Sequence, residues 1–187
     1  MNNPYAIGSK IYLRAPTMED AKGAWHEWFS DPEITKYLAD RYLPNSKEAQ
    51  IEFFESLLHS KDRVVFSICK VDDDTHIGVC GLSSINWFHG YADQTYVIGK
   101  TQPDNGVVIA EVVKLLLEVA FMRLNLKNLR SVYAGRNSIT PIIDKMFGFK
   151  TVGKLTKFIT CEGEVDDVVI MQLSKEDWIL RNKNNNN

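Results

Sequence analysis

The stretch at residues 95–125 constrains the fold of this chain more than any other. It begins with Thr-Tyr-Val-Ile, whose β-branched and aromatic side chains favour a strand. Residues 99–106 then contain two glycines, a proline, an aspartate and an asparagine, which favour turns. From residue 107 to 120 the only charged residues are Glu111, Lys114 and Glu118, so we expect an apolar helix with one polar stripe. A strand that leads through a tight turn into a helix presents free backbone N–H groups, and this predicts an anion site at the turn.

The length and composition indicate one globular domain. The 187 residues suffice for a full hydrophobic core, and 44% of them are hydrophobic and 25% charged, which is ordinary for such a domain. We expect a single domain over residues 1–180 and a polar tail at 181–187, which ends in four asparagines. A formal net charge of −2 provides no bulk attraction to nucleic acid, so we predict no nucleic-acid partner.

The cysteines and the apolar runs bear on the compartment. The three cysteines are odd in number and two lie in strand-like apolar runs, so we interpret Cys69, Cys80 and Cys161 as buried reduced thiols of a cytoplasmic protein. The N-terminus lacks an apolar stretch of signal length, and no run of about 18 apolar residues predicts a membrane span. The four histidines show no metal-ligand spacing, so we expect no metal.

The other segments alternate between strand and helix patterns. Thr17 and Asp20 form a capping-box pattern at the start of a helix that we expect to end at Asp31, because Pro32 disfavours helix in the residue before it. Ser46 is the predicted N-cap of a second helix. The apolar face of that helix should comprise Ile51, Phe54, Leu57 and Leu58. We predict strands at 11–14, 64–71, 76–85, 94–99 and 129–134, a helix at 139–147, and a final hairpin of 149–160 with 165–173. This order predicts an α/β fold whose sheet is mostly antiparallel, with one parallel crossover.

Four phrases carry a resemblance to a known family. They occur in the order HIGVCGLSSINW (76–87), YVIG (96–99), LLLEVAFMRLNL (115–126) and NSITPIIDKMFGF (137–149). Together they span roughly the C-terminal two thirds of the chain and resemble the GNAT superfamily of acyl-CoA-dependent N-acetyltransferases, in particular its ribosomal-protein and sugar-amine branch. The resemblance implies the GNAT fold, in which a mixed sheet flanked by helices splays between its fourth strand, here 94–99, and its fifth, here 129–134.

The resemblance implies transfer of the acetyl group of acetyl-CoA to a primary amine. In this family the amine attacks the thioester carbonyl directly, a backbone N–H helps to hold the oxyanion, a base removes the ammonium proton, and no metal is needed. The acceptor side is walled by the first helix pair. The sequence leaves the acceptor open among a protein N-terminus, an amino sugar and a small amine.

The positions that match the family's donor site follow from the same resemblance. The acetyl and pantetheine groups would be lined by Val97, Ile98 and Gly99. Asn137 would hydrogen-bond the pantetheine arm. The pyrophosphate would face Asn105, Gly106, Val107, Val108, Ile109 and Ala110.

The expected pyrophosphate loop departs from the family pattern Arg/Gln-x-x-Gly-x-Gly/Ala. The pattern falls on residues 104–109, and the three usual glycine positions hold Asn105, Val107 and Ile109. We expect the two β-branched residues to resist a left-handed backbone and to project toward the phosphates. Asp104 adds a like charge, and Gly106 compensates in part.

The catalytic candidates are Asp93, Thr140 and Asp144. Asp144 stands where many members carry the tyrosine that protonates the leaving thiolate. Members of the ribosomal-protein branch often lack that tyrosine and show Asn-x-x-Ser, which NSIT at 137–140 approximates, so Thr140 is the candidate partner of the thiol. Asp93 lies near the family's position for a carboxylate base, with a polar strand-edge residue as the alternative interpretation. Asn137 equally fits a helix cap.

These departures leave two other hypotheses open. The chain could be a non-catalytic member of the fold that binds an acyl-CoA, another ligand or a protein partner, or a structural domain with no small-molecule site. A covalent acyl-enzyme is not expected, because Cys161 lies in a turn without an accompanying base. A homodimer through the final hairpin is compatible with the sequence.

Overall fold

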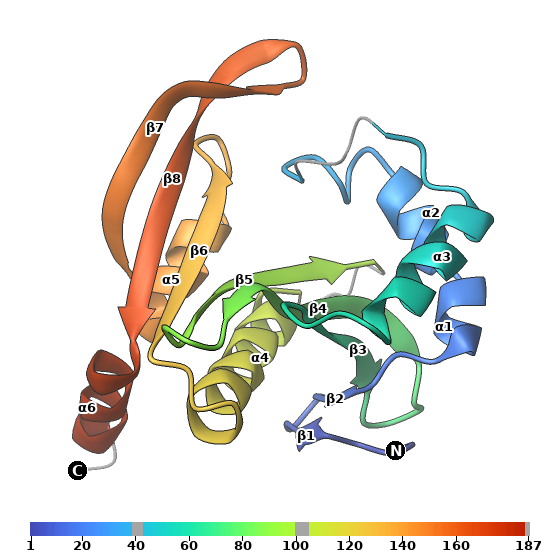
Figure 1. Cartoon of the computed structure of the whole chain (residues 1–187), viewed down its shortest axis with the longest axis horizontal. Coiled ribbons are helices and arrows are strands. Elements are labelled where there is room, and N and C mark those ends of the chain that lie inside the picture. The colour runs from blue at the N-terminus through green and yellow to red at the C-terminus, as the bar shows by residue number, and fades with distance from the viewer. Residues whose placement is uncertain (39–42, 100–104, 186–187) are drawn as a thin grey trace.

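A computed structural model describes residues 1–38, 43–99 and 105–185, and its centre is an eight-stranded sheet (Figure 1). The strands follow the order β1-β2-β3-β4-β5-β6-β8-β7, and β5 pairs with β6 in parallel while the other neighbours are antiparallel. The strands are β1 (Ala6–Ile7), β2 (Ile11–Arg14), β3 (Val64–Lys70), β4 (His76–Asn86), β5 (Tyr91–Ile98), β6 (Asn128–Ala134), β7 (Lys150–Cys161) and β8 (Glu164–Ser174). The predicted mostly antiparallel sheet with one parallel crossover is therefore confirmed.

Helices cover both faces of the sheet. They are α1 (Met18–Lys22), α2 (Trp25–Ser30), α3 (Lys47–Leu57), α4 (Asn105–Glu118), which continues as the π-helical turn η1 (Val119–Arg123), α5 (Thr140–Phe147) and α6 (Lys175–Asn185). Val79 of β4 packs with α1, α2 and α3, whereas the adjacent Cys80 packs with α4. Successive strand residues point to opposite faces, so α1–α3 and α4 lie on opposite sides of the sheet.

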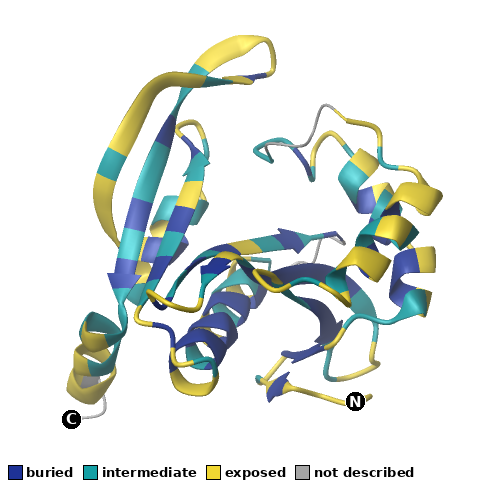
Figure 2. Ribbon diagram, viewed as in Figure 1, coloured by how far each residue is buried: buried dark blue, intermediate teal, exposed yellow. Residues whose placement is uncertain are grey.

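The helix α4 forms the main core against the sheet, as its sequence predicts. Six of its residues are buried, and Figure 2 shows α4 coloured largely as buried. The polar stripe is also present, and its first member has a tertiary contact. The Glu111 carboxylate accepts hydrogen bonds from the backbone N–H groups of Lys10 and Ile11, at 2.9 and 3.1 Å, and so holds the β1–β2 turn. All three cysteines are free and buried, as predicted.

The N-terminal helices differ from the prediction in one respect. The Thr17–Asp20 capping box is present, but the expected single helix is broken after Lys22 because Gly23 adopts a non-helical backbone. Ser46 caps α3 as predicted by accepting a hydrogen bond from the Ala49 N–H at 3.1 Å. Of the expected apolar face, Ile51, Phe54 and Leu57 join one core cluster, whereas Leu58 follows the helix and is exposed.

The element boundaries differ at three other places. β5 begins at Tyr91, three residues before the predicted strand, because these residues pair with both β4 and β6. The short β1 and the helix α6 were not predicted from the sequence pattern. α6 includes residues 181–185, which the sequence analysis places in a polar tail, and it is anchored by Trp178, whose ring lies 5.4 Å from that of Phe121. A largely polar helix has little apolar periodicity, so its sequence pattern is weak.

A buried ionic cluster joins α1 to the sheet. Arg14 and Asp20 are 8% and 6% exposed, and the Arg14 Nη2 lies 2.8 Å from Asp20 Oδ1. The Ser67 hydroxyl donates to the same carboxylate at 2.8 Å, and His76 Nδ1 lies 3.2 Å from it. Burial alone would raise the pKa of Asp20, but the hydrogen bond from Arg14, with His76, Thr17 and Ser67, lowers this pKa to about 2.

Candidate active site

The sheet opens between β5 and β6. These strands pair only from Tyr91 opposite Asn128 to Asp93 opposite Arg130. Beyond that point β5 remains paired with β4 as far as Ile98, and β6 with β8 as far as Ala134. Within the described residues, each strand therefore has one inner edge with no strand partner, and the two edges diverge in Figure 1. Open edges present backbone N–H and C=O groups that an extended ligand with amide groups can bind.

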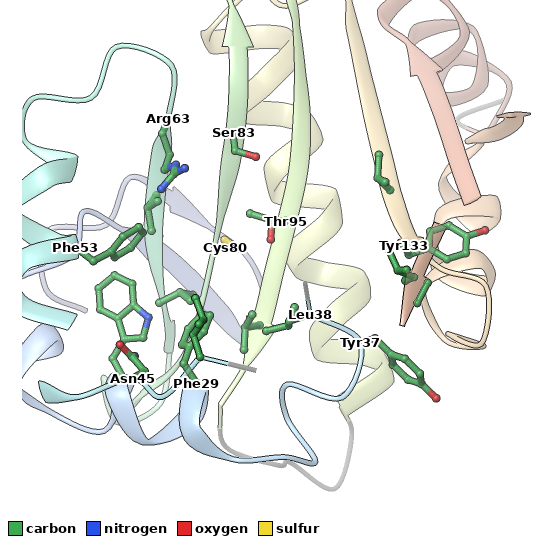
Figure 3. Close-up of a pocket in the computed structure, with 18 of the residues that line it drawn as sticks. Phe29, Tyr37, Leu38, Asn45, Phe53, Arg63, Cys80, Ser83, Thr95 and Tyr133 are labelled. Atoms are coloured by element: carbon green, nitrogen blue, oxygen red, sulfur yellow. The ribbon is translucent and has the colours of Figure 1, made fainter. Parts of the chain in front are cut away.

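A cleft of about 870 Å³ extends from this opening across the sheet. Its floor is formed by β3, β4 and β5, one wall by α2, α3 and the segments around them, and the other wall by β6, β7 and β8 (Figure 3). Apolar and aromatic side chains predominate, among them Trp25, Phe29, Tyr37, Phe53, Val79, Val97 and Tyr133. The cleft thus joins the gap between the splayed strands to the side of the molecule where α1–α3 lie.

The three donor-site residues predicted on β5 take different places. Val97 is 7% exposed and lines the cleft, as expected. The Ile98 side chain points to the opposite face and packs against the core cluster under α4, so only its backbone faces the gap. Gly99 is buried against the indole of Trp28, where a Cβ would lie 1.8 Å from a ring carbon. Only a residue without a side chain fits at this position.

The predicted pyrophosphate residues form the first turns of α4. Residues 105–110 are helical, and none of the described members of this run has a positive φ, so the expected backbone strain at Val107 and Ile109 does not arise. Ile109 packs against the core and Val107 is 53% exposed, so only Val107 projects into solvent at this turn. Val108 is buried and Ala110 packs inward. Asp104 lies outside the described residues.

Asn137, Thr140 and Tyr96 form a polar chain on the helix side of the opening. Asn137 Oδ1 accepts hydrogen bonds from the N–H groups of Ile139 and Thr140, both at 3.1 Å, and its Nδ2 donates to the Thr140 hydroxyl at 2.9 Å. Asn137 therefore holds the turn that leads into α5, although the N-cap residue itself is Ile139. The Tyr96 hydroxyl, from β5, lies 3.4 Å from Thr140 Oγ1. Burial raises the pKa of Tyr96 to about 12, so its phenol keeps its proton at neutral pH.

Asp144 is buried below the opening, with no exposed surface. Its Oδ1 accepts a hydrogen bond from Gln94 Nε2 at 2.9 Å, whereas its Oδ2 and the Gln94 Oε1 are both buried acceptors with no partner among the described groups. Burial raises the pKa of Asp144 to about 6, against the smaller lowering effects of Ser131 and Gln94 beside it. Asp144 is a buried carboxyl that does not line the described cleft.

Asp93 forms an ion pair on the cleft side of β5. Its two oxygens accept hydrogen bonds from Arg130 Nε and Nη2 at 2.7 and 2.9 Å, and Arg130 also lies over the ring of Tyr91. Both carboxylate oxygens are thus engaged by one guanidinium. Asp93 shares a strand face with Thr95, which lines the cleft, but it does not itself line the described part of the cleft.

Several residues of the site escape sequence reasoning. Gln94 and Tyr96 alternate with Thr95 and Val97 along β5, so the sequence predicts that Gln94 and Tyr96 share one face of the strand. It does not predict that this face meets α5. Arg63 directly precedes β3, outside every family phrase, and only the fold brings it into the cleft.

A splayed mixed sheet with a cleft at the splay and a helix following the inner strand defines the GNAT type of acetyltransferase fold. Residues 10–149 match the acetyltransferase (GNAT) domain family, and the chain belongs to that family.

The known relatives agree with this assignment. An uncharacterized N-acetyltransferase p20 of Bacillus licheniformis is 27% identical over 171 residues, which cover 90% of this chain and 95% of that protein. A spermidine N-acetyltransferase from Vibrio cholerae, solved with CoA and spermine, matches with a TM-score of 0.79 at 21% identity, over 92% of this chain and 99% of the other. A GNAT-family acetyltransferase from Bacillus anthracis matches with a TM-score of 0.77 at 16% identity, over 91% and 98%. At these identities the solved structures show the shared fold.

Two features are absent from the described residues. No helix in 1–38, 43–99 or 105–185 is both long and apolar enough to cross a membrane. The same ranges contain no group of three or more His, Cys, Asp or Glu residues arranged to hold a metal ion.

Proposed function

We propose that this protein is an acetyl-CoA-dependent N-acetyltransferase that acts on a primary amine by direct attack. The observation that carries the proposal is the opening between β5 and β6, where two unpaired strand edges lead into the cleft. An extended pantetheine arm with its two amides suits such edges, because it can take the place of the missing strand hydrogen bonds. The opposite half of the cleft leaves room for an amine.

Acetyl-CoA supplies the activated acyl group as a thioester. The substrate ammonium first gives one proton to a base. The amine nitrogen then bonds to the acetyl carbon as the carbon–sulfur bond breaks, the nitrogen loses a second proton, and the departing thiolate takes one. Thr140 is the proposed partner of the sulfur, with Asn137 holding its hydroxyl in place and Tyr96 as the proton source behind it. Asp93 remains the proposed base, and it would have to exchange its contacts with Arg130 for the substrate ammonium.

The first turn of α4 is the proposed pyrophosphate site. Free N–H groups and the positive end of the helix dipole attract phosphate there. Val107 is exposed at this turn, whereas Met122 is exposed at the far end of the same helical segment. A negative charge at Val107 should repel the phosphates, and the same charge at Met122 should not.

Calorimetric titration with acetyl-CoA and CoA tests the donor site. We expect Val107→Glu to weaken binding about tenfold, which corresponds to ~1.4 kcal/mol, while Met122→Glu leaves it unchanged. Release of CoA in the presence of an amine panel tests the reaction. If the wild-type protein neither binds acetyl-CoA nor releases CoA with any amine, the proposed function is wrong.

A non-catalytic member of the family is the second candidate. It is favoured by the buried Asp144 at the tyrosine position and by the lack of any Asp or Glu among the described residues that line the cleft. Such a protein would bind acetyl-CoA but release no CoA in the presence of amines. Turnover by the purified protein excludes it.

A further inference from the structure

The acceptor half of the cleft offers an apolar surface to its ligand. Four aromatic side chains from α2, α3 and the segment after α2 line it, namely Trp25, Phe29, Tyr37 and Phe53. Val65 and Val79 of the sheet complete this surface. An acceptor that fills this half of the cleft therefore carries an apolar body.

The buried polar groups at this surface include two unpaired donors. Gln50 is 3% exposed, and its Oε1 accepts a hydrogen bond from Asn45 Nδ2 at 2.9 Å, which leaves Nε2 without a partner among the described groups. Trp25 is 1% exposed, and its Nε1 is also buried with no partner among the described groups. Both residues line the cleft. Unpaired buried donors are rare in folded proteins, and these two would be satisfied by an oxygen of the ligand.

The formal charge on the described lining of the cleft is positive. Arg63 is the only charged residue among the described residues that line the cleft. Its guanidinium lies over the ring of Phe53, 5.6 Å from the centroid, and it makes no ion pair with the described acidic residues. Figure 3 shows Arg63 near Phe53, with Ser83 and Thr95 on the neighbouring strands β4 and β5. A planar guanidinium above an aromatic ring is well suited to a carboxylate.

We propose that the acceptor is an amine with an apolar body and a carboxylate, that is, an apolar amino carboxylic acid. The inference rests on the proposed acetyltransferase function and specifies its substrate class. Arg63 binds the carboxylate, the aromatic wall holds the body, and the Gln50 and Trp25 donors take further oxygens. A polyamine fits this lining poorly, because its positive charges would meet Arg63 and find no carboxylate among the described residues that line the cleft.

The first test compares acceptors that differ only in the carboxylate. CoA release is measured with phenylalanine against phenylalaninamide, with 4-(aminomethyl)benzoate against 4-(aminomethyl)benzamide, and with spermidine. The two pairs place the carboxylate at different distances from the amine. We expect the acid of at least one pair to exceed its amide about tenfold in kcat/KM, as a charge-assisted contact at a cleft rim provides, and to exceed spermidine.

The second test removes the proposed contact. Arg63 is exposed, so Arg63→Met should fold normally. We expect it to lower kcat/KM for the preferred acid about tenfold and to leave the matching amide within about twofold, because only the acid loses its counter-charge. Arg63→Glu should reverse the preference. The matched control is Arg123→Met, which removes an arginine that stacks on Tyr5, away from the cleft.

The outcomes separate this inference from the function on which it rests. The proposed substrate class is wrong if CoA release is faster with spermidine or with both amides. It is also wrong if Arg63→Met leaves the preference for the acid intact. In both cases the protein is still an acetyltransferase. Binding of acetyl-CoA with no release from either acid also overturns it. Absence of both binding and release overturns the function itself.

Discussion

Replacement of Asp144 by asparagine should stabilise the protein at neutral and alkaline pH. The carboxyl is fully buried, and its Oδ2 and the Gln94 Oε1 are both acceptors without a described donor. Asparagine has nearly the same shape, keeps an oxygen for the Gln94 amide, and adds an N–H₂ group that can donate to an orphan acceptor. The substitution therefore removes a buried charge and pairs a buried polar atom.

The magnitude follows from the shift in pKa. Burial raises the pKa of Asp144 from 3.8 to about 6 in the folded protein. A carboxyl with a raised pKa contributes its full stability below pH 3.8 and loses it as the pH rises through about 6. Roughly two pKa units at ~1.4 kcal/mol each give a penalty of ~3 kcal/mol at pH 8, which Asp144→Asn abolishes.

Urea denaturation at pH 8 and at pH 4 measures the effect. We expect Asp144→Asn to raise the free energy of unfolding by about 2–3 kcal/mol at pH 8 and by less than about 0.5 kcal/mol at pH 4, with an unchanged m-value. The matched control is Asp177→Asn, because Asp177 is an accessible carboxylate paired with Lys150, whose loss should slightly destabilise the protein at pH 8.

Two results would refute this reasoning. A variant less stable than the wild type at pH 8 would mean that neighbouring groups compensate the charge of the ionised carboxylate. A gain that persists unchanged at pH 4 would mean that packing, and not the charge, is responsible. The kcat of Asp144→Asn shows whether Asp144 also takes part in catalysis. A fall in kcat of about a hundredfold would indicate a proton-transfer group, whereas an unchanged kcat would indicate a structural role.

Two other predictions concern Asp20, which is buried in the ionic cluster with Arg14, and Gly99 at the end of β5. Asp20→Asn leaves the buried Arg14 without its counter-charge and should cost about 3–5 kcal/mol in urea denaturation at pH 7, whereas the exposed Glu19→Gln on the same helix should cost less than about 0.5 kcal/mol. The pKa of the Asp20 carboxyl is lowered from 3.8 to about 2, so its contribution to the free energy of unfolding is complete above pH 3.8 and is lost as the pH falls through 2. Equal stability of the wild type and Asp20→Asn at pH 7 would contradict this prediction. Gly99→Ala places a methyl group against the Trp28 indole and should lower the melting temperature and weaken acetyl-CoA binding in calorimetry, and an unchanged affinity would separate this residue from the donor site.

Local patterns explain why most elements could be predicted. The capping box at Thr17, the Ser46 cap and the glycine turn of the final hairpin depend on residues within a few positions of one another. The wrong predictions for the first helix and for α6 also arise because only local patterns can be read from a sequence. Gly23 interrupts a helix that the apolar spacing continues, and α6 is held by tertiary contacts of Trp178, Asp177 and Arg181 and not by a periodic apolar face.

One of the residues predicted for the donor site lines the cleft, namely Val97. The role of the first turn of α4 as a pyrophosphate site stays a prediction. The expected strain at Val107 and Ile109 was wrong, because the helix begins early enough to hold both in right-handed backbone and the core takes the Ile109 side chain. Whether a β-branched residue hinders a phosphate depends on the helix start, which the turn residues alone do not define.

The sequence by itself determined the family and the order of most strands and helices, because each depends on contiguous residues. The anion site at the turn before α4 stays a prediction. Tertiary structure alone decided which side chains meet. It buries Asp144 against Gln94, places Tyr96 beside Thr140, and brings Arg63 and Gln50 into one cleft from β3 and α3. The charge and hydrogen-bonding character of a cleft is a sum over residues far apart in the chain, so it exists only once the sheet and helices have assembled.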